Sequence, residues 1–538
     1  MESYDFIVVG AGSAGSALAA RLSESGRHRV LLLEAGPDDR RFWIQVPIGY
    51  GRSFYDRRVN WMYMTEAVPT LAGRPSYWPR GKVLGGSSSI NAMVYVRGQA
   101  EDYEDWQAAG NPGWGWDDVL PLYKRMECHA WGESDCHGGA GPLFIKAPST
   151  ELHPTCEDFL RACEEAGQSR NPDFNGPRQE GVGTYHITVK GGRRMSAARA
   201  YLWSARGRSN LRIETGAEAR RVLFEGRRAV GVEYMKHGRM QTARAGAEVV
   251  LSAGAVNTPK LLLLSGVGPA EELSRLGIAP VVDSPAVGRH LQDHFDVGLI
   301  YRSKVPTLNN QLHPWWGKLW AGMKYVAARR GPLALSLNQA GGFVRSRPEL
   351  TRPNLQIYFS PLSYLKAPPG TRPLMNPDPY AAFHMSASPC RPTSRGVLCL
   401  KSPDPADAPE IHPNYLATEH DVQEVVEGLR FLRRIAETPT MRRLVTAEVP
   451  PNPAGSDDDS LLEYARNHGV TVFHPAGTCR MGPDSKSCVV DPKLRVHGID
   501  ALRVADASIF PTLPSGNINA PAILTGEKAS DLILSCGN

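Results

Sequence analysis

The sequence predicts an α/β fold, in which a parallel sheet covered by helices is joined to a second, smaller domain. Three observations predict it. An apolar strand pattern at the N-terminus runs into a glycine-rich turn, a helix and a second strand. The 538 residues exceed what one simple hydrophobic core accommodates. Residues 300–460 differ in composition from the N-terminal segment, because they carry scattered aromatic residues and many prolines.

The composition is that of an ordinary globular protein, with 42% apolar and 22% charged residues. The net charge of +6 is spread over short basic clusters such as Arg220-Arg221. Such clusters are typical of a solvated surface, so we expect no nucleic-acid partner.

Nine cysteines occur without a CxxC pair, which predicts free thiols and a cytoplasmic location. No run of 18 apolar residues is present, so no transmembrane helix is expected. The first residues lack the basic region of a signal peptide. Peripheral contact with an anionic inner-membrane surface stays open.

The first element is a buried strand over residues 6–9, followed by Gly10-Ala11-Gly12-Ser13-Ala14-Gly15 and a helix over 14–24. Gly10 permits the tight turn, Gly12 lets the backbone approach a pyrophosphate, and Gly15 lets the helix pack on the strand. The helix N-terminus offers unpaired N–H groups to phosphates.

A second strand over residues 29–33 ends at Glu34. A carboxylate there can accept both ribose hydroxyls and would repel a 2′-phosphate, so an NADP-type ligand is disfavoured. A glycine turn can be purely structural, but strand, turn, helix, strand and acid in this order favour a dinucleotide. The motif does not separate NAD from FAD.

Three later segments add to this pattern. Residues 79–91 form a Gly/Ser-rich loop with apolar flanks, whose N–H groups can face phosphate or a flat ring. Residues 247–251 predict a strand and then a helix, with Thr258 as N-cap and Pro259 at its first position. Residues 502–505 predict a strand ending at Asp506, and a helix is expected over 522–534.

Together these segments resemble the glucose–methanol–choline (GMC) family of FAD-dependent oxidoreductases, in its branch of choline-dehydrogenase-like and alcohol dehydrogenases. The loop from Arg80 to Asn91 and the stretch 254–269 resemble the two family signatures. Residues 473–478 and Asn517-Ile518-Asn519 resemble its active site. The resemblance covers nearly the whole chain.

The resemblance implies FAD bound in an extended form. Ile90 stands where some relatives attach the flavin to a histidine, so we expect noncovalent FAD. The residues expected to contact FAD are Gly10, Gly12, Ser13, Ala14, Gly15, Glu34, Ala35, Trp61, Arg80, Val83, Gly85, Gly86, Ser89, Asn91, Ala92, Met93, Val94, Val222, Ala253, Gly254, Asp506, Ala507, Asn517, Asn519, Ala520 and Pro521.

The resemblance also implies that the domains are interleaved. We expect a Rossmann-like FAD-binding domain from residues 1–155, 190–300 and 465–538. Residues 156–189 and 301–464 are expected to form a smaller α+β substrate domain on an antiparallel sheet, with strands over 354–359 and 396–400. Its aromatic residues are expected mainly in the core: Trp315, Trp316, Trp320, Tyr358, Phe359 and Tyr364.

Alcohol oxidation removes a proton from oxygen and a hydride from carbon. Histidine suits the first task, because its ordinary pKa lies near working pH, and the matching residue is His474. An amide can donate to the alcohol oxygen without titrating, and the family pattern points to Asn519, with Asn517 as a competitor. The alternative for His474 is a turn histidine before Pro475.

The other histidines match no motif. His290 and His294 are spaced i, i+4, which suits a metal on a helix, but no third ligand is apparent. We therefore expect no metal, and structural or solvent roles for both. His384 is left without a role.

The substrate is expected to be a small alcohol. Choline-oxidising relatives place a Glu where this chain has Gln339, and a neutral amide cannot pair with a cation. A neutral primary alcohol, aliphatic or aromatic, is therefore preferred. The expected acceptor is a quinone or another carrier; the alternatives are an oxygen-using oxidase and, less favoured, a hydroxynitrile lyase of the same fold.

Overall fold

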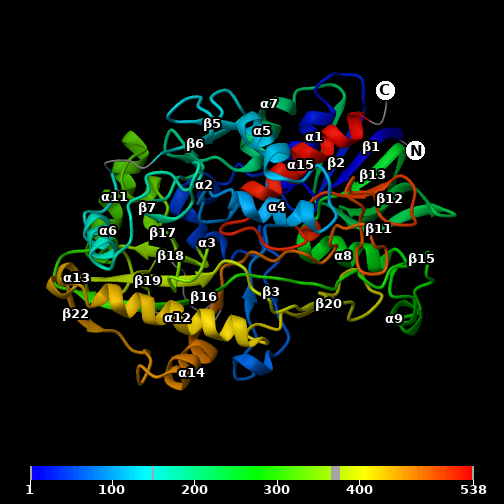
Figure 1. Ribbon diagram of the computed structural model, residues 1–538. Coiled ribbons are helices and arrows are strands. Elements are labelled where there is room, and N and C mark those ends of the chain that lie inside the picture. The colour runs from blue at the N-terminus through cyan, green and yellow to red at the C-terminus, as the bar shows by residue number, and fades with distance from the viewer. Residues whose placement is uncertain (1–2, 148–150, 365–375, 536–538) are drawn as a thin grey trace.

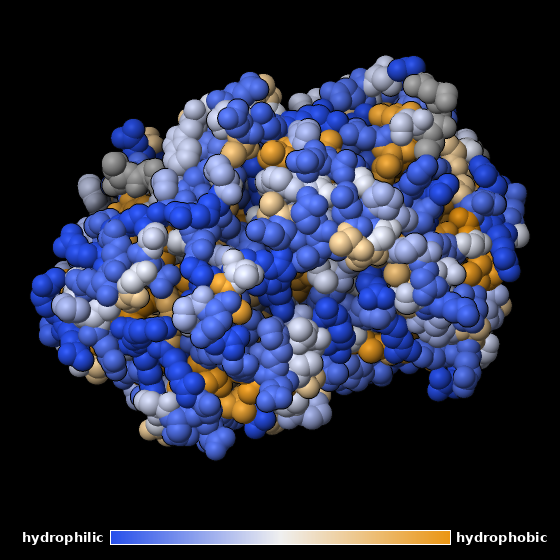
Figure 2. Space-filling model, viewed as in Figure 1, coloured by the Kyte–Doolittle hydropathy of each residue, from blue (hydrophilic) through white to orange (hydrophobic). Residues whose placement is uncertain are grey.

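Two seven-stranded sheets organise the protein (Figure 1). The computed structural model describes residues 3–147, 151–364 and 376–535. One sheet is mainly parallel and the other antiparallel, so the expected fold class is confirmed. The face shown in Figure 2 is mostly hydrophilic, with small separate hydrophobic patches.

The first sheet contains the predicted nucleotide-binding strands. Its parallel part is formed by β10 (Leu211–Thr215), β2 (Val30–Glu34), β1 (Ser3–Val9), β13 (Arg239–Leu251) and β24 (Leu502–Val504). β2 and most of β1 are buried, as strands covered on both faces must be. The first half of β13 forms an antiparallel pair with β12 (Arg228–Lys236). β12 in turn forms an antiparallel pair with β11 (Ala217–Glu225).

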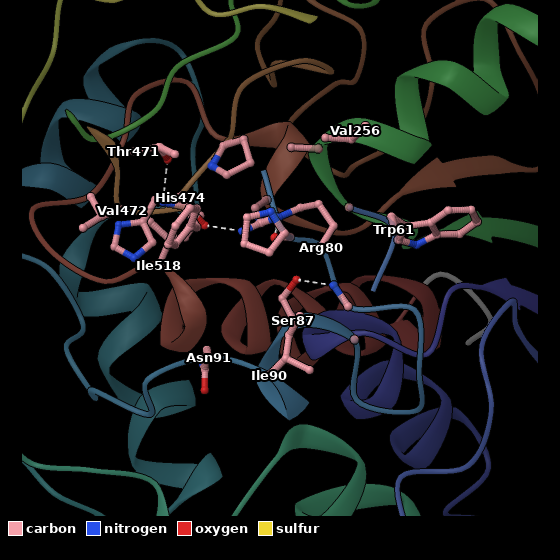
Figure 3. A pocket seen from close by; sticks show the side chains of 18 of the residues that line it. Trp61, Arg80, Ser87, Ile90, Asn91, Val256, Thr471, Val472, His474 and Ile518 are labelled. Atoms are coloured by element: carbon pink, nitrogen blue, oxygen red, sulfur yellow. Dashed lines mark hydrogen bonds between the residues drawn. The ribbon is translucent and has the colours of Figure 1, made fainter. Parts of the chain in front are cut away.

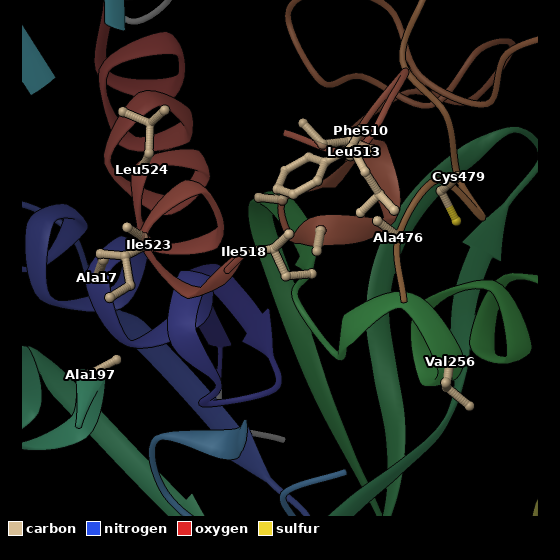
Figure 4. Packing of buried hydrophobic residues seen from close by; sticks show 14 of the residues in the cluster. Ala17, Ala197, Val256, Ala476, Cys479, Phe510, Leu513, Ile518, Ile523 and Leu524 are labelled. Atoms are coloured by element: carbon tan, nitrogen blue, oxygen red, sulfur yellow. The ribbon is translucent and has the colours of Figure 1, made fainter. Parts of the chain in front are cut away.

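The first and last helices of the chain lie side by side on this sheet. α1 (Ser13–Leu22) ends two residues before the expected boundary, and α15 (Asn519–Leu534) begins three residues earlier than expected. An added Cβ on Gly526 would lie 2.2 Å from the carbonyl oxygen of Ala14, so the absent side chain allows close approach. Figure 4 shows Ala17 beside Ile523 at this contact.

The helix after β13 begins earlier than the sequence indicates. α8 (Gly254–Leu264) has Ala253 as its N-cap, and Pro259 lies inside the helix, so the predicted start at Thr258 and Pro259 is wrong. Pro259 has no N–H for the carbonyl of Ala255, four residues earlier. The hydroxyl of Thr478 donates to that carbonyl oxygen at 2.7 Å. A residue more than two hundred positions away thus makes the proline tolerable.

The second sheet forms the substrate domain. Its order is β22 (Val445–Glu448), β16 (Phe295–Ser303), β19 (Ala382–Pro389), β18 (Leu355–Ser360), β17 (Ala340–Val344) and β7 (Gly181–Thr184). β18 lies within one residue of the strand expected over 354–359, and β20 (Val397–Cys399) within one residue of the strand expected over 396–400. β20 is not part of this sheet, however, because it pairs with β21 (Glu410–His412) in a separate two-stranded sheet. α12 (Glu419–Ala436) packs across β19 and β16, and α6 (Thr155–Glu165) packs on β17 and β7.

β16 runs through the domain boundary expected at residue 300, and β23 (Val470–Thr471) also pairs with it. The second sheet therefore takes residues from 295 onward and a strand from the C-terminal segment. His290 and His294 lie in irregular chain before β16 rather than on a helix. Among the described residues no group of three His, Cys, Asp or Glu side chains is placed to hold a metal.

The remaining elements are short helices and two-stranded ribbons around these sheets. The helices are α2 (Phe42–Gln45), α3 (Tyr50–Ser53), α4 (Ala100–Ala108), α5 (Trp116–Met126), α7 (Trp203–Ala205), α9 (Ala270–Arg275), α10 (Leu308–Leu312), α11 (Trp315–Ala328), α13 (Pro439–Leu444) and α14 (Asp458–His468). The strands are β3 (Tyr63–Met64), β4 (Tyr77–Trp78), β5 (Glu127–His129), β6 (Leu143–Ile145), β8 (Val189–Lys190), β9 (Arg193–Arg194), β14 (Val267–Gly268), β15 (Val282–Asp283) and β21 (Glu410–His412). In the described part of the chain, no helix combines the length and apolarity needed to cross a bilayer.

Candidate active site

A cavity of about 810 Å³ opens where the parallel strands end (Figure 3). Its walls include Gly10 after β1, Glu34 at the end of β2, Ala253 after β13 and Asp506 after β24. Ligands of open α/β sheets bind at this edge, because loops and helix N-termini converge there. The position matches the predicted dinucleotide site.

The glycines of the first turn bring backbone, not side chains, to the cavity. Gly10 has φ +98°, and an added Cβ would lie 2.5 Å from the carbonyl oxygen of Ser252. The 79–91 loop lies directly on the same turn, since a Cβ on Gly86 would lie 2.7 Å from Cα of Gly12. A Cβ on Gly15 would lie 1.9 Å from the carbonyl oxygen of Gly10. These contacts form a backbone cradle of the kind a pyrophosphate requires.

Glu34 is buried at the rim of this cradle. Its carboxylate accepts hydrogen bonds from the backbone N–H of Ala11 at 3.1 Å and of Gly36 at 2.8 Å. Burial raises the pKa of Glu34 to about 7. The carboxylate lines the cavity, where it can accept ribose hydroxyls. The residues present therefore fit an adenine dinucleotide.

Most residues expected to contact the cofactor line this cavity. They are Gly10, Gly12, Ser13, Ala14, Glu34, Ala35, Trp61, Arg80, Gly86, Asn91, Ala92, Met93, Val94, Ala253, Gly254, Asp506, Ala507, Asn517 and Asn519. Gly15, Val83, Gly85, Ser89, Val222, Ala520 and Pro521 lie outside the lining.

Several of the residues outside the lining hold the walls in place. Val83 packs on Ile44 and Val59. The N–H of Gly85 donates to the carbonyl of Ala11 at 2.7 Å, and the hydroxyl of Ser89 to that of Leu84 at 2.6 Å. Ala520 and Pro521 occupy the first turn of α15.

Val222, one of the residues expected to contact FAD, does not line the cavity, and its N–H donates to Ser265 Oγ at 2.8 Å. Ala217, Glu218 and Ala219, at the start of the same strand, line it instead.

The catalytic candidate His474 is fixed through its backbone. Its N–H donates to Asp293 Oδ1 at 2.7 Å, and Arg80 donates to the carbonyl oxygen of Phe473 at 2.6 Å. Phe473 itself has φ +67°, a left-handed conformation that is unusual for a bulky residue. Figure 3 shows His474 at the opposite end of the cavity from Trp61, with Arg80 between them. The strained turn therefore aims the imidazole into the cavity.

A chain of hydrogen bonds sets the tautomer of His474. Nε2 of His294 lies 2.8 Å from the carbonyl oxygen of Cys390, which can only accept, so Nε2 carries the proton. Nδ1 of His294 is then an acceptor, and Nδ1 of His474 donates to it at 3.0 Å. Nε2 of His474 keeps its lone pair. His294, for which the sequence indicated only a structural or solvent role, thus controls the candidate base.

Both imidazoles are neutral. Burial lowers the pKa of His294 to about 4. Burial, together with the neighbouring His294 and Arg80, holds the pKa of His474 well below its ordinary value of 6.5. At neutral pH the lone pair on Nε2 of His474 is consequently available to take a proton.

The amide beside this lone pair belongs to Asn517. Its Nδ2 lies 3.2 Å from Nε2 of His474, and its Oδ1 accepts from Gln356 at 3.0 Å. Asn519 accepts from the hydroxyl of Ser13 at 2.8 Å, because it begins α15 and faces the glycine turn. The amide that contacts His474 is therefore Asn517, the competitor, and not Asn519, to which the family pattern points.

Beside His474, part of the substrate side of the cavity is apolar. Figure 3 shows Val472 and Ile518 beside His474, and Leu337 and Leu362 also line the wall. Gln339 does not line it, since its Oε1 accepts from the backbone N–H of His153 at 2.9 Å. The neutral side chain of Gln339 therefore does not disfavour choline as a substrate.

Sequence reasoning missed several residues of this wall, namely Phe54, Tyr55, Ser87, Asp296, Asn338, Ser360 and His384. They come from six separate places in the sequence, and no local pattern distinguishes them. Tyr358 and Tyr364, expected in the core, line the cavity as well. Trp315, Trp316 and Trp320 are 61–75% exposed, so their expected core position is wrong.

Comparisons with known proteins agree with this site. The GMC oxidoreductase family matches residues 4–296 and 392–526. The chain is 44% identical over 536 residues to an alcohol dehydrogenase [acceptor] of Pseudomonas putida, covering 99% of this chain and 96% of that protein. It is 42% identical to the mitochondrial choline dehydrogenase of Homo sapiens, covering 99% and 90%. The structure of pyridoxine 4-oxidase from Mesorbium loti superimposes with a TM-score of 0.87 at 32% identity, covering 98% of each chain.

The chain therefore belongs to the GMC oxidoreductase family. It is an oxidoreductase acting on CH–OH donors, and its cofactor is FAD.

Proposed function

We propose that the protein is an alcohol dehydrogenase that oxidises a neutral primary alcohol to the aldehyde and passes the electrons to a quinone or another carrier. One observation carries the proposal: an accepting Nε2 on His474 and a donating Nδ2 on Asn517 lie 3.2 Å apart at the wall of the cavity. An alcohol hydroxyl needs this pair, because it must give up its proton while its oxygen gains charge.

FAD, when bound, supplies the hydride acceptor at N5 of its ring. The protein residues do the rest. Nε2 of His474 takes the hydroxyl proton, while Nδ2 of Asn517 donates to the oxygen. Gln356 holds the amide of Asn517 so that Nδ2 faces the imidazole. The apolar wall around Val472 and Ile518 excludes water from the developing charge.

His294 acts as a positioning residue in this mechanism. In His294→Leu, Nδ1–H of His474 loses its acceptor and the base can adopt the wrong tautomer, so we expect kcat to fall by about 10²-fold. The pKa of His474 should rise, because a neighbour that lowers it is gone. The acidic limb of the kcat/KM profile should then move to higher pH. Steady-state kinetics between pH 5 and 9 measure both effects.

His294→Asn keeps an accepting oxygen near Nδ1 and serves as the matched control. It should recover most of the rate lost in His294→Leu. Equal losses in both variants, with an unmoved acidic limb, would assign His294 a packing role only.

The name of one relative supports the proposed acceptor. The relative from Pseudomonas putida is named an alcohol dehydrogenase [acceptor]. Others are named oxygen-dependent choline dehydrogenases, so oxygen is the alternative acceptor. The eight cysteines of the described residues are free thiols, which supports a cytoplasmic location.

A second candidate substrate is a cationic alcohol such as choline. Asp296 lines the cavity together with the rings of Tyr358 and Tyr364. A carboxylate and aromatic faces are the groups that hold a quaternary ammonium. The apolar character of the wall nearest His474 favours the neutral alcohol.

An anaerobic alcohol panel tests the proposed function. The purified holoenzyme is mixed with 1-butanol, 1-octanol, benzyl alcohol and choline, and the absorbance of oxidised flavin is followed. We expect the neutral primary alcohols to bleach the flavin faster than choline does. Bleaching by choline alone would replace the first candidate by the second.

Two further outcomes would contradict the proposal. Rapid oxygen uptake with the best alcohol would identify an oxidase. Cleavage of a cyanohydrin with the flavin still oxidised, and no bleaching by any alcohol, would identify a lyase.

A further inference from the structure

One helix of the substrate domain presents an apolar surface to solvent. We use the name α11 face for a set of six side chains of this helix that are 48–75% exposed. They are Trp315, Trp316, Leu319, Trp320, Met323 and Val326. At about 100° per residue these six point to one side of the helix. The buried residues Gly317, Ala321 and Tyr325 lie on the opposite side, against the protein. Of the described residues, no other helix carries so many exposed large apolar side chains.

The packing of α11 explains why this face points outward. Tyr325 donates from its hydroxyl to the carbonyl oxygen of Gly192 at 3.0 Å. A Cβ on Gly317 would lie 2.1 Å from the carbonyl oxygen of Gln311. These contacts fix the rotation of α11, so the tryptophans cannot turn inward. α11 lies at an edge of the molecule (Figure 1).

The charges around the α11 face are all positive within its own segment. Lys318 and Lys324 are exposed and flank the apolar side, one on each border. Arg329 and Arg330 follow the last turn. No Asp or Glu occurs between Asp296 and Glu349. A surface that faces this helix should therefore be apolar in its interior and anionic at its border.

A phospholipid bilayer with anionic headgroups has this chemistry. Tryptophan is enriched at the membrane–water interface, and lysine can extend its ammonium group to the headgroups while its chain stays in apolar surroundings. α11 has 14 residues and is about 21 Å long, too short to span the hydrocarbon core. We propose that the α11 face seats in the interfacial layer of a bilayer that contains anionic phospholipid.

A second cavity links the proposed membrane contact to the proposed function. This link rests on that function. A mostly apolar cavity of about 290 Å³ lies beneath α11, and exposed residues such as Phe42, Lys318 and Val326 line it. Leu337 and Leu362 line both this cavity and the flavin cavity. The two cavities thus share two leucines in their walls. A ligand with an alkyl or isoprenoid chain, whether alcohol or quinone, can exchange with the bilayer there.

Vesicle co-sedimentation of the holoenzyme tests whether the α11 face binds a bilayer. The vesicles are phosphatidylcholine alone or phosphatidylcholine with about one-third phosphatidylglycerol, at low and high salt. We expect the wild-type protein to sediment with the anionic vesicles and less so at high salt, because headgroup attraction is screened. The triple variant Trp315→Ser, Trp316→Ser, Trp320→Ser should lose at least about tenfold in partition coefficient.

The matched controls change the same chemistry elsewhere. Trp131→Ser removes a tryptophan that is 54% exposed outside α11 and should bind like wild type. Lys318→Glu with Lys324→Glu should weaken binding to anionic vesicles, whereas Lys401→Glu with Lys486→Glu, the same charge change on other exposed lysines, should not. Every variant should keep the wild-type rate of flavin reduction by a water-soluble alcohol. Loss of membrane binding is therefore distinct from loss of the proposed function.

Three results would overturn the proposal. The first is wild-type protein that stays in the supernatant with both kinds of vesicle. The second is a triple variant that sediments as the wild type does. The third is a dimer in sedimentation velocity without vesicles that the triple variant abolishes, since the α11 face would then be covered by a second copy.

Discussion

Replacement of His474 by alanine is expected to lower the rate at which an alcohol reduces the flavin by about 10²–10⁴-fold, the range that a positioned general base contributes. FAD should stay bound, because the glycine cradle and Glu34 are unchanged in this variant. The measurement is anaerobic stopped-flow bleaching of the flavin, with cofactor content read from the visible spectrum.

His412→Ala is the control for this variant, because His412 is an exposed histidine on β21. It should reduce flavin at the wild-type rate. If His474→Ala matched that rate with full FAD content, the base would have to be another group of the cavity.

Asn517→Ala should slow flavin reduction by about 10²–10³-fold, as expected when one donor to a developing oxyanion is lost. Asn519→Ala should behave differently. It removes the acceptor of Ser13 at the glycine turn, so it should weaken FAD retention while each molecule that still holds FAD keeps its rate. The two variants are compared by their rate per bound flavin and by the FAD released on dilution.

The opposite pattern would restore the assignment that the sequence favoured. A large loss of rate per flavin in Asn519→Ala, with little change in Asn517→Ala, would place the donor at Asn519. Asn517→Asp adds a further control, since it keeps Oδ1 as an acceptor for Gln356 but offers no N–H to the alcohol oxygen.

The nucleotide site could be predicted from the sequence because its requirements are local. A strand, a turn free of side chains and a helix must follow one another, and a carboxylate must end the next strand. Gly10, Gly12 and Glu34 meet these requirements within 36 residues, and all three line the cavity. The spacing of these residues in the sequence was therefore the main basis for predicting the nucleotide site.

The catalytic pair depended on information that is not local. Asn517 and Asn519 are both asparagines near the start of a helix, and the exact first residue of α15 decides which one faces the glycine turn. The role of His294 depends on a contact across 180 residues. Neither the first residue of α15 nor the contact of His294 can be predicted from the spacing of residues.

The position of Val222 outside the cavity lining has a different cause. β11 has a register shift between Ala219 and Arg221, where the strand departs from regular pairing with β12. A bulge changes which side chains face a given side of a strand. Val222, which the resemblance implied as an FAD contact, lies beyond this shift, whereas Ala217 and Ala219, which line the cavity, precede it.

The pairing of α1 with α15 has a consequence for how the enzyme is made. Buried Glu527 accepts hydrogen bonds from Arg21, Arg125 and Tyr201, and Asn519 accepts one from Ser13. Domains generally fold as they leave the ribosome, N-terminal parts first. Here α1 must wait for α15, which is synthesised about 506 residues later, so the nascent chain cannot complete its cofactor pocket until α15 has left the ribosome.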